Sequence, residues 1–134
     1  MSATLRRVLR FYFVGAIGVG VQLLALAGLK SGLRINYLLA TTLAVEAAVA
    51  HNFLWHERFT WAERRTSAGL RRFIKFNASN GAISIVGNVL GMALLGRVAK
   101  INYLAANTVS IAGCSLLNFL VSDRLVFMKP AGQA

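Results

Sequence analysis

Two arginines stand in the same short pattern and have the chemistry to bind a phosphate group. Arg58 follows Glu57, Arg124 follows Asp123, and an aromatic residue comes three positions after each arginine. A guanidinium fork matches phosphate oxygens better than a lysine ammonium does. We expect the pair to hold a phosphate at a membrane surface; the alternative is that each arginine only anchors the topology beside a compensating acid. The same role is expected for Arg10 and Arg72, which match each other at the starts of two apolar segments.

Polar side chains recur at helical spacing near these arginines. Asn52 and Asn118 lie six residues before Arg58 and Arg124, nearly two helical turns deeper. In the third apolar segment, four polar residues follow one another at intervals of three and four, so they share one helix face. We interpret the set as a polar path; the alternative is interhelical hydrogen bonding worth about 1 kcal/mol per bond. The path comprises Asn52, Asn118, Asn77, Asn80, Ser84, Asn88 and, in the first segment, Gln22.

One acid, Glu46, lies near the middle of the second apolar segment. A charged carboxylate at that depth costs at least about 2.5 kcal/mol, so the group must be protonated, paired or facing water. The first hypothesis is a proton carrier or counter-charge, and the second is a neutral, hydrogen-bonded side chain with no mechanistic part. Ala112 stands at the matching position later in the chain.

The residue types needed for catalysis are not gathered anywhere in the sequence. His51 and His56 are five apart, which places them on different faces of a helix, so no metal site is expected. The chain lacks a Gly-x-x-x-x-Gly-Lys-Ser/Thr phosphate loop and shows no nucleophile and base pair. We therefore expect no enzyme activity and no cofactor.

The elements that must position these residues are membrane-spanning helices. The chain has 134 residues, of which 57% are hydrophobic and 14% charged. Four windows are long enough to cross a hydrocarbon core of about 30 Å. The fold class expected is all-α integral membrane, one membrane domain over residues 1–134. The spans are Phe11–Leu29, Tyr37–Trp55, Phe76–Leu95 and Leu104–Val121. The aromatic residues expected in the interfacial belts, at the two membrane surfaces, are Trp55, Trp61, Tyr37, Tyr103 and Phe127.

Basic residues are distributed unevenly between the two sides of these spans. The formal net charge is +11, and eleven of the fifteen lysines and arginines precede the first span, lie between the second and third, or follow the fourth. The positive-inside rule then places both termini and the central loop in the cytoplasm. The same placement explains the charge without nucleic acid, which we exclude as a partner.

The two halves of the sequence share a pattern. Residues 35–38 return as 101–104 and the arginine motifs return at the same offset of 66, which indicates a tandem duplication. Repeat 1 covers about 9–61, a basic interfacial linker about 62–71, repeat 2 about 72–127, and a short tail 128–134. Each repeat is expected to be a helical hairpin, and the two are parallel. The linker forms a short interfacial helix or a solvated loop, and Gly87 with Gly91 predicts close approach of a second helix.

These motifs together resemble the GtrA-like family of small four-span membrane proteins over about residues 9–127. They are the Arg-Phe-x-x-Val-Gly start at Arg10, its second copy from Arg72 to Asn80, and the doubled Asn-Phe-Leu-x-x-x-Arg-x-x-aromatic ending. The chain departs from the family pattern at Glu57, Asp123 and Gly18, where relatives often have asparagine. The resemblance implies flipping of a polyprenyl-phosphate-linked sugar across a bacterial inner (plasma) membrane for cell-surface polysaccharide synthesis.

Two alternatives to a flippase come from other functional classes. One is a membrane platform that recruits or stabilises a glycosyltransferase without transporting anything. Another is a small multidrug exporter, although the acid of such proteins is expected in the first helix rather than the second. The expected partners are the lipid-linked sugar, membrane lipids and a glycosyltransferase of the same pathway. Because four spans make a thin bundle, a homo-oligomer, a dimer, is also expected.

Overall fold

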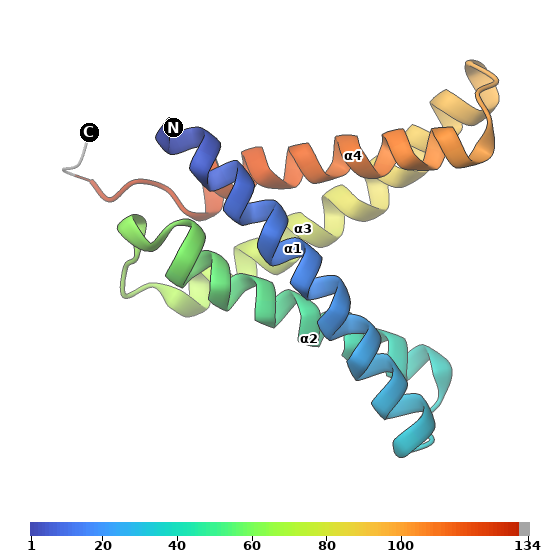
Figure 1. The fold of residues 1–134 in the computed structure, drawn as a ribbon, viewed down its shortest axis with the longest axis horizontal. Helices are drawn as coiled ribbons and strands as arrows, with labels where there is room; N and C mark the ends of the chain where they lie inside the picture. Colours follow the sequence, from blue (N-terminus) through green and yellow to red (C-terminus); the bar gives the residue numbers. More distant parts are fainter. Residues whose placement is uncertain (132–134) are drawn as a thin grey trace. The chain divides into compact units, whose positions relative to one another are not determined.

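The computed structural model describes residues 1–131, apart from the side chains of Tyr37, Met92, Tyr103 and Leu104. Its described residues form helices and no strand, so the all-α fold with four apolar helices is confirmed (Figure 1). Short π-helical or 3-10 turns extend or connect the long helices. The long helices are α1 (Ala3–Ala27), α2 (Tyr37–Trp55), α3 (Gly69–Met92) and α4 (Tyr103–Val121); the turns are η1 (Gly28–Gly32), η2 (His56–Thr60), η3 (Ala62–Arg64), η4 (Ala93–Val98) and η5 (Ser122–Val126).

Each helix with its π turn is long and apolar enough to span a membrane. The candidate spans have mean hydropathies between 1.3 and 1.9. Large apolar side chains are exposed along all four helices, for example Leu24, Leu38, Ile85 and Val109. Apolar surface on this scale belongs in lipid rather than in water. The protein is therefore a multi-pass membrane protein, with spans Ala3–Gly32, Leu38–Thr60, Gly69–Val98 and Ala105–Val126.

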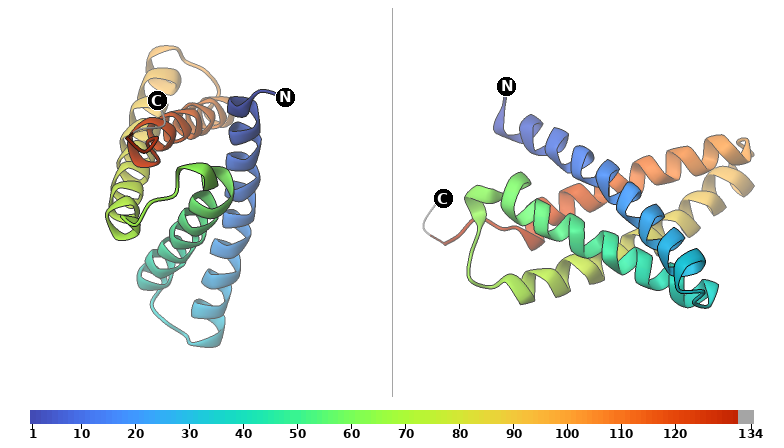
Figure 2. Two further views of the ribbon diagram at one scale, coloured as in Figure 1. Left: turned by 90° about the vertical axis from the view of Figure 1, so that its left-hand side faces the viewer. Right: turned by 60° about the horizontal axis from the view of Figure 1, so that its bottom comes forward.

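The chain divides into two compact units, one covering Met1–Thr66 and the other beginning at Ser67. Unit 1 is the hairpin of α1 and α2, and unit 2 is the hairpin of α3 and α4; both views in Figure 2 show the two helices of each hairpin side by side. Tyr37 and Tyr103, expected in the interfacial belts, have side chains outside the described residues.

The same backbone details occur in both hairpins at positions 66 apart. Arg34 and Lys100, in the turns between helices, both have φ of 54°. These are left-handed conformations that cost a non-glycine residue about 1 kcal/mol or more. The amide that closes each final π turn donates over 2.8 Å, from Trp61 to the carbonyl of His56 and from Phe127 to that of Ser122. A tandem duplication predicts such agreement between corresponding residues.

Small residues on α2 allow the first hairpin to pack closely. Ala40, Ala44 and Ala48 recur every four residues and are buried, so they form one packing face. On α1, a Cβ at Gly18 would overlap the side chain of Asn52. The glycine therefore lets the two helices approach closely enough for the Asn52 amide to lie against the backbone of α1.

Glycines perform the same task in the second hairpin. A Cβ at Gly87 would overlap the Sγ atom of Cys114, and one at Gly91 would overlap Ser110. The close approach predicted for this glycine pair is confirmed, and the helix that approaches is α4 of the same unit.

The basic segment between the two hairpins is helical only at its ends. One 3-10 turn forms at Ala62–Arg64, residues 65–68 are not helical, and α3 begins at Gly69. A continuous interfacial helix, one of the two forms expected for the linker, is not present. The basic residues from Arg71 to Lys75 instead belong to the first turns of α3.

Candidate functional site

Arg10, near the start of α1, binds η2 at the end of the same hairpin. Its Nη1 atom donates a hydrogen bond of 2.8 Å to the carbonyl oxygen of Phe59, and its guanidinium carbon lies 4.5 Å from the centre of the Phe59 ring. Carbonyls at the end of a helix lack intrahelical partners, and a cation there also meets the negative end of the helix dipole. Arg10 therefore holds η2 against α1, while most of its five N–H donors stay outside this bond.

A buried aromatic cluster fixes the position of η2. The rings of Phe11 and His56 stack at 4.8 Å with an interplanar angle of 8°, and Trp61 meets both edge-on at 6.1 and 5.4 Å. The Nδ1 atom of His56 lies 3.0 Å from the hydroxyl of Thr60. His56, Thr60 and Trp61 are almost fully buried. Since Arg58 lies within η2, this cluster also fixes the position of the Arg58 backbone.

The expectation that Trp61 and Phe127 belong to interfacial aromatic belts is wrong. Both side chains have an exposed fraction of 0%. The chain leaves each final π turn by folding back, with the backbone amide of the aromatic residue bonded to a carbonyl five positions earlier. The fold-back turns Trp61 toward Phe11, and places Phe127 edge-on to Phe76 at 6.2 Å. Trp55, by contrast, is 52% exposed.

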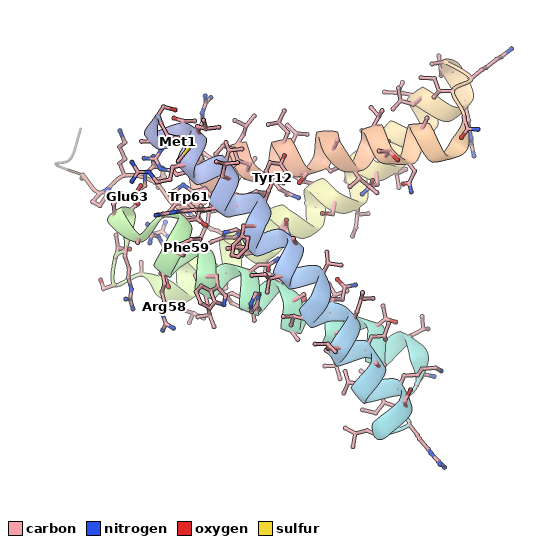
Figure 3. All side chains as sticks on the ribbon, viewed as in Figure 1. Met1, Tyr12, Arg58, Phe59, Trp61 and Glu63 are labelled. Carbon is pink, nitrogen blue, oxygen red and sulfur yellow. The ribbon has the colours of Figure 1, made fainter. Side chains whose placement is uncertain are left out.

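Arg58 lines an open hollow of about 180 Å³ on the outer side of α2, together with His51, Leu54 and Trp55. Figure 3 shows Arg58 pointing away from the first helix, whereas Trp61 lies close to it. The Nδ1 atom of His51 is 3.2 Å from the Oδ1 atom of Asn52. An amide oxygen only accepts, so this bond requires the proton on Nδ1, and in the neutral imidazole Nε2 is then an acceptor. The hollow thus offers a cation, an exposed aromatic face and a hydrogen-bond acceptor.

In the second hairpin the corresponding arginines divide in the same way. Arg72 is buried, and its guanidinium carbon lies 5.3 Å from the centre of the Phe127 ring. Arg124 is exposed, as Arg58 is. The structure therefore divides the four expected phosphate-binding arginines into two kinds: Arg10 and Arg72 stack on aromatic rings of their own hairpins, while Arg58 and Arg124 face outward.

Three residues of the expected polar path meet between α3 and α4. The Nδ2 atom of Asn88 donates to the carbonyl oxygen of Ser84 over 2.7 Å, and the Nδ2 atom of Asn118 lies 3.5 Å from the Ser84 hydroxyl. The Oδ1 atoms of Asn88 and Asn118 are buried and accept no hydrogen bond from the described residues. Buried carbonyl oxygens of this kind are almost always paired in proteins, so both are open to a donor such as a hydroxyl group or water.

The other expected path residues do not join this cluster. Asn77 and Asn80 are half-buried on α3, one to two turns before Ser84. In the first hairpin, Asn52 packs against Gly18, and Gln22 is half-buried one turn further along α1. Polar side chains of α3 and α4 therefore meet at Ser84 and Asn118.

Glu46 faces outward from the first hairpin. Its neighbours Ala44 and Ala48 point into the packing face, and Glu46, two residues from each, is exposed. Its side chain therefore lies outside the buried alanine face of α2. Its role as a proton carrier or counter-charge stays a prediction.

Sequence reasoning missed the cluster of Phe11, His56, Thr60 and Trp61. A histidine and a threonine one turn apart at the end of an apolar helix were the available signal. Among the described residues, no three His, Cys, Asp or Glu side chains come together to hold a metal ion.

Comparison with known proteins gives one match. The family model described as GtrA/DPMS, transmembrane domain, matches residues 10–127. No curated protein sequence matches the chain.

Proposed function

Because the chain belongs to the GtrA/DPMS transmembrane-domain family, we propose that it moves a polyprenyl-phosphate-linked sugar from the cytoplasmic to the outer leaflet of a bacterial inner membrane. The observation that carries this proposal is the hollow around Arg58. A polyprenyl-phosphate-linked sugar has a phosphate next to a ring with an apolar C–H face and several hydroxyl groups. Three groups of the hollow complement these features: the guanidinium of Arg58 the phosphate, the exposed face of Trp55 the C–H face, and the Nε2 atom of His51 a hydroxyl group.

The position of the hollow suits the entry of a headgroup. It lies at the end of the second span, on the side where basic residues are concentrated and where the positive-inside rule places the cytoplasm. The hollow is open, and apolar side chains such as Leu54 border it. A lipid tail can therefore stay in the bilayer while the headgroup meets Arg58.

A headgroup that crosses the membrane needs hydrogen-bond partners at membrane depth. In the second hairpin, the Oδ1 atoms of Asn88 and Asn118 have no hydrogen-bond partner among the described residues and are acceptors for sugar hydroxyls. Translocation makes and breaks no covalent bond, so the proposal requires no catalytic group. A glycosyltransferase that consumes the sugar on the far side would draw the flux outward, and a second copy of the chain would help to enclose the headgroup.

A membrane platform could dock a partner through the glycine-rich third span or through the basic loop, and the glycines are engaged within their own hairpin. Bulky substitutions at Gly87 or Gly91 are expected to break a complex if these glycines dock a partner. Both glycines face α4 within their own hairpin, so such substitutions act on the hairpin itself.

The test is transfer of a polyprenyl-phosphoryl hexose between the leaflets of proteoliposomes. Periodate added outside oxidises only sugars in the outer leaflet, so a translocase raises the oxidised share from the outer-leaflet half toward all of the lipid. Arg58→Gln should slow the transfer at least about tenfold, because a charge-assisted bond to phosphate is lost. Arg65→Gln removes the same charge from the exposed linker and should leave the rate unchanged. Equal rates for the two variants would remove Arg58 from the mechanism, and no transfer by the wild type would end the proposal.

A further inference from the structure

A second basic pocket lies in unit 1 where α1 begins, and it shares no lining residue with the Arg58 hollow. Its volume is about 90 Å³. Side chains from the first turns of α1 and from the segment that follows α2 surround it. The lining residues are Ala3, Arg6, Arg7, Arg10, Thr60 and Glu63.

The pocket carries more positive than negative charge and more donors than acceptors. Three guanidinium groups face one carboxylate, which leaves an excess of two positive charges. Arg10 is held by the Phe59 carbonyl, and the Nε atom of Arg7 pairs with the Oε1 atom of Glu63 at 3.0 Å. The side chain of Arg6 makes no hydrogen bond or ion pair with any described residue. Since each guanidinium has five N–H donors, the pocket is built to accept further anionic oxygens.

The start of α1 adds to this preference. The Ser2 hydroxyl accepts from the amide of Leu5 over 3.2 Å, which caps one of the free amides of the first turn. The remaining amides of that turn and the helix dipole favour an anion beside Ala3. The backbone thus acts in the same direction as the three arginines.

We propose that this pocket binds a phosphate group, and that Glu63 is the internal anion which the phosphate displaces from Arg7. Glu63 is poised for exchange because its side chain is half-exposed and can swing into solvent. Three cationic side chains then surround the phosphate. The positive charge of Arg64, which also lowers the pKa of Glu63, attracts the released carboxylate.

The pocket is particular to the first hairpin and does not depend on the proposed translocation. Arg6 and Arg7 precede the region that the family model matches. Counted from the match of Arg10 with Arg72, Ala68 and Gly69 stand at the positions of Arg6 and Arg7 in the second hairpin, and Lys129 stands 66 residues after the acid. A protein that moved no lipid could still have this site.

The phosphate could be carried by a lipid or be a free ion. From the pocket, α1 continues directly into an apolar span whose residues Leu5, Leu9 and Phe13 are exposed. This places the arginines at the depth of lipid headgroups, where basic residues attract anionic lipids. The two sources share the same phosphate oxygens and are separated by the choice of probe.

The experiment is calorimetric titration of the purified full chain in a neutral detergent. The probes are short-chain phosphatidic acid, the matching diacylglycerol without phosphate, and inorganic phosphate. Arg6→Gln/Arg7→Gln should weaken the binding of the phosphate probes at least about tenfold, as charge-assisted hydrogen bonds are lost. Arg65→Gln/Arg71→Gln removes two charges from exposed residues outside the pocket and should bind as the wild type does. Tighter binding of phosphatidic acid than of phosphate assigns the site to lipid, and equal binding assigns it to the free ion.

Glu63→Gln gives an independent test in the opposite direction. Removing the internal competitor should tighten phosphate binding about two- to fivefold, the range expected for an exposed ion pair. The proposal is overturned if Glu63→Gln weakens binding, or if the two double variants bind the phosphate probes equally well. It is also overturned if diacylglycerol binds as tightly as phosphatidic acid. These binding results do not depend on the transport assay: they would stand even if the protein moved no sugar lipid in liposomes.

Discussion

Replacing Gly91 by alanine should force the second hairpin apart. A Cβ at this position would overlap the Oγ and Cβ atoms of Ser110 and would come within 3.4 Å of its Cα atom. The Cβ atom of Ser110, at 2.8 Å, is fixed by the backbone of α4, so the conflict is not relieved by rotating a side chain alone. Overpacking of this kind costs about 1–3 kcal/mol.

Gly81 supplies the matched control on the same helix. A Cβ there meets no atom within 4 Å. Each glycine-to-alanine change also gains about 0.5–1 kcal/mol of helix propensity. Because this gain is common to both variants, the difference in hairpin stability between Gly91→Ala and Gly81→Ala isolates the steric term of about 1–3 kcal/mol.

Cys114 provides the assay. It is the only cysteine of the chain, it is buried, and its Sγ atom packs on α3 with a contact of 3.6 Å to the Ile83 carbonyl. A thiol-specific dye reaches it only when α3 and α4 separate. At a factor of ten per 1.4 kcal/mol, Gly91→Ala should be labelled about 5- to 140-fold faster than Gly81→Ala. Equal labelling rates would refute the close packing of α3 on α4.

Three further predictions concern the first hairpin and the polar cluster. Arg10→Gln should destabilise the protein by about 1–3 kcal/mol in thermal unfolding, because its charged hydrogen bond to Phe59 and its ring contact are lost. Burial alone would raise the pKa of Glu63, but the hydrogen bond from its own backbone N–H and the charge of Arg7 lower that pKa below 4.5. The stability that the carboxylate adds is therefore present above its pKa in the unfolded chain and lost as the pH falls through its pKa in the folded protein. The melting temperatures of the wild type and of Glu63→Gln should differ at neutral pH and converge in acid. Asn118→Leu should change stability by less than about 1 kcal/mol, since its Oδ1 atom has no partner among the described residues, yet slow sugar-lipid transfer.

Much of the fold follows from patterns that can be read along the chain. Apolar runs of sufficient length predict all four helices, because lipid permits few other structures for such segments. The pair Gly87 and Gly91 predicts a close helix contact, because only small side chains allow backbones to approach. The sequence does not say which helix approaches, and the structure identifies α4.

The site depended on features that spacing does not reveal. The π turns η2 and η5 shift the register at the ends of two helices, so Trp61 and Phe127 point inward where a regular helix would place them elsewhere. The ion pair of Arg7 with Glu63 joins residues 56 apart in the chain. Such a contact depends on the way the segment after α2 folds back over α1. Arg58, in contrast, could be predicted as an outward-facing cation, because it lies at the end of an apolar span.

The measurement that tests the central proposal most directly is selective transfer between leaflets. Proteoliposomes containing the wild-type chain are loaded with polyprenyl-phosphoryl hexose and, separately, with a labelled phosphatidylcholine. The account predicts fast transfer of the sugar lipid and a phosphatidylcholine rate equal to that of protein-free liposomes. Failure to move the sugar lipid, or equal acceleration of both lipids, would contradict it.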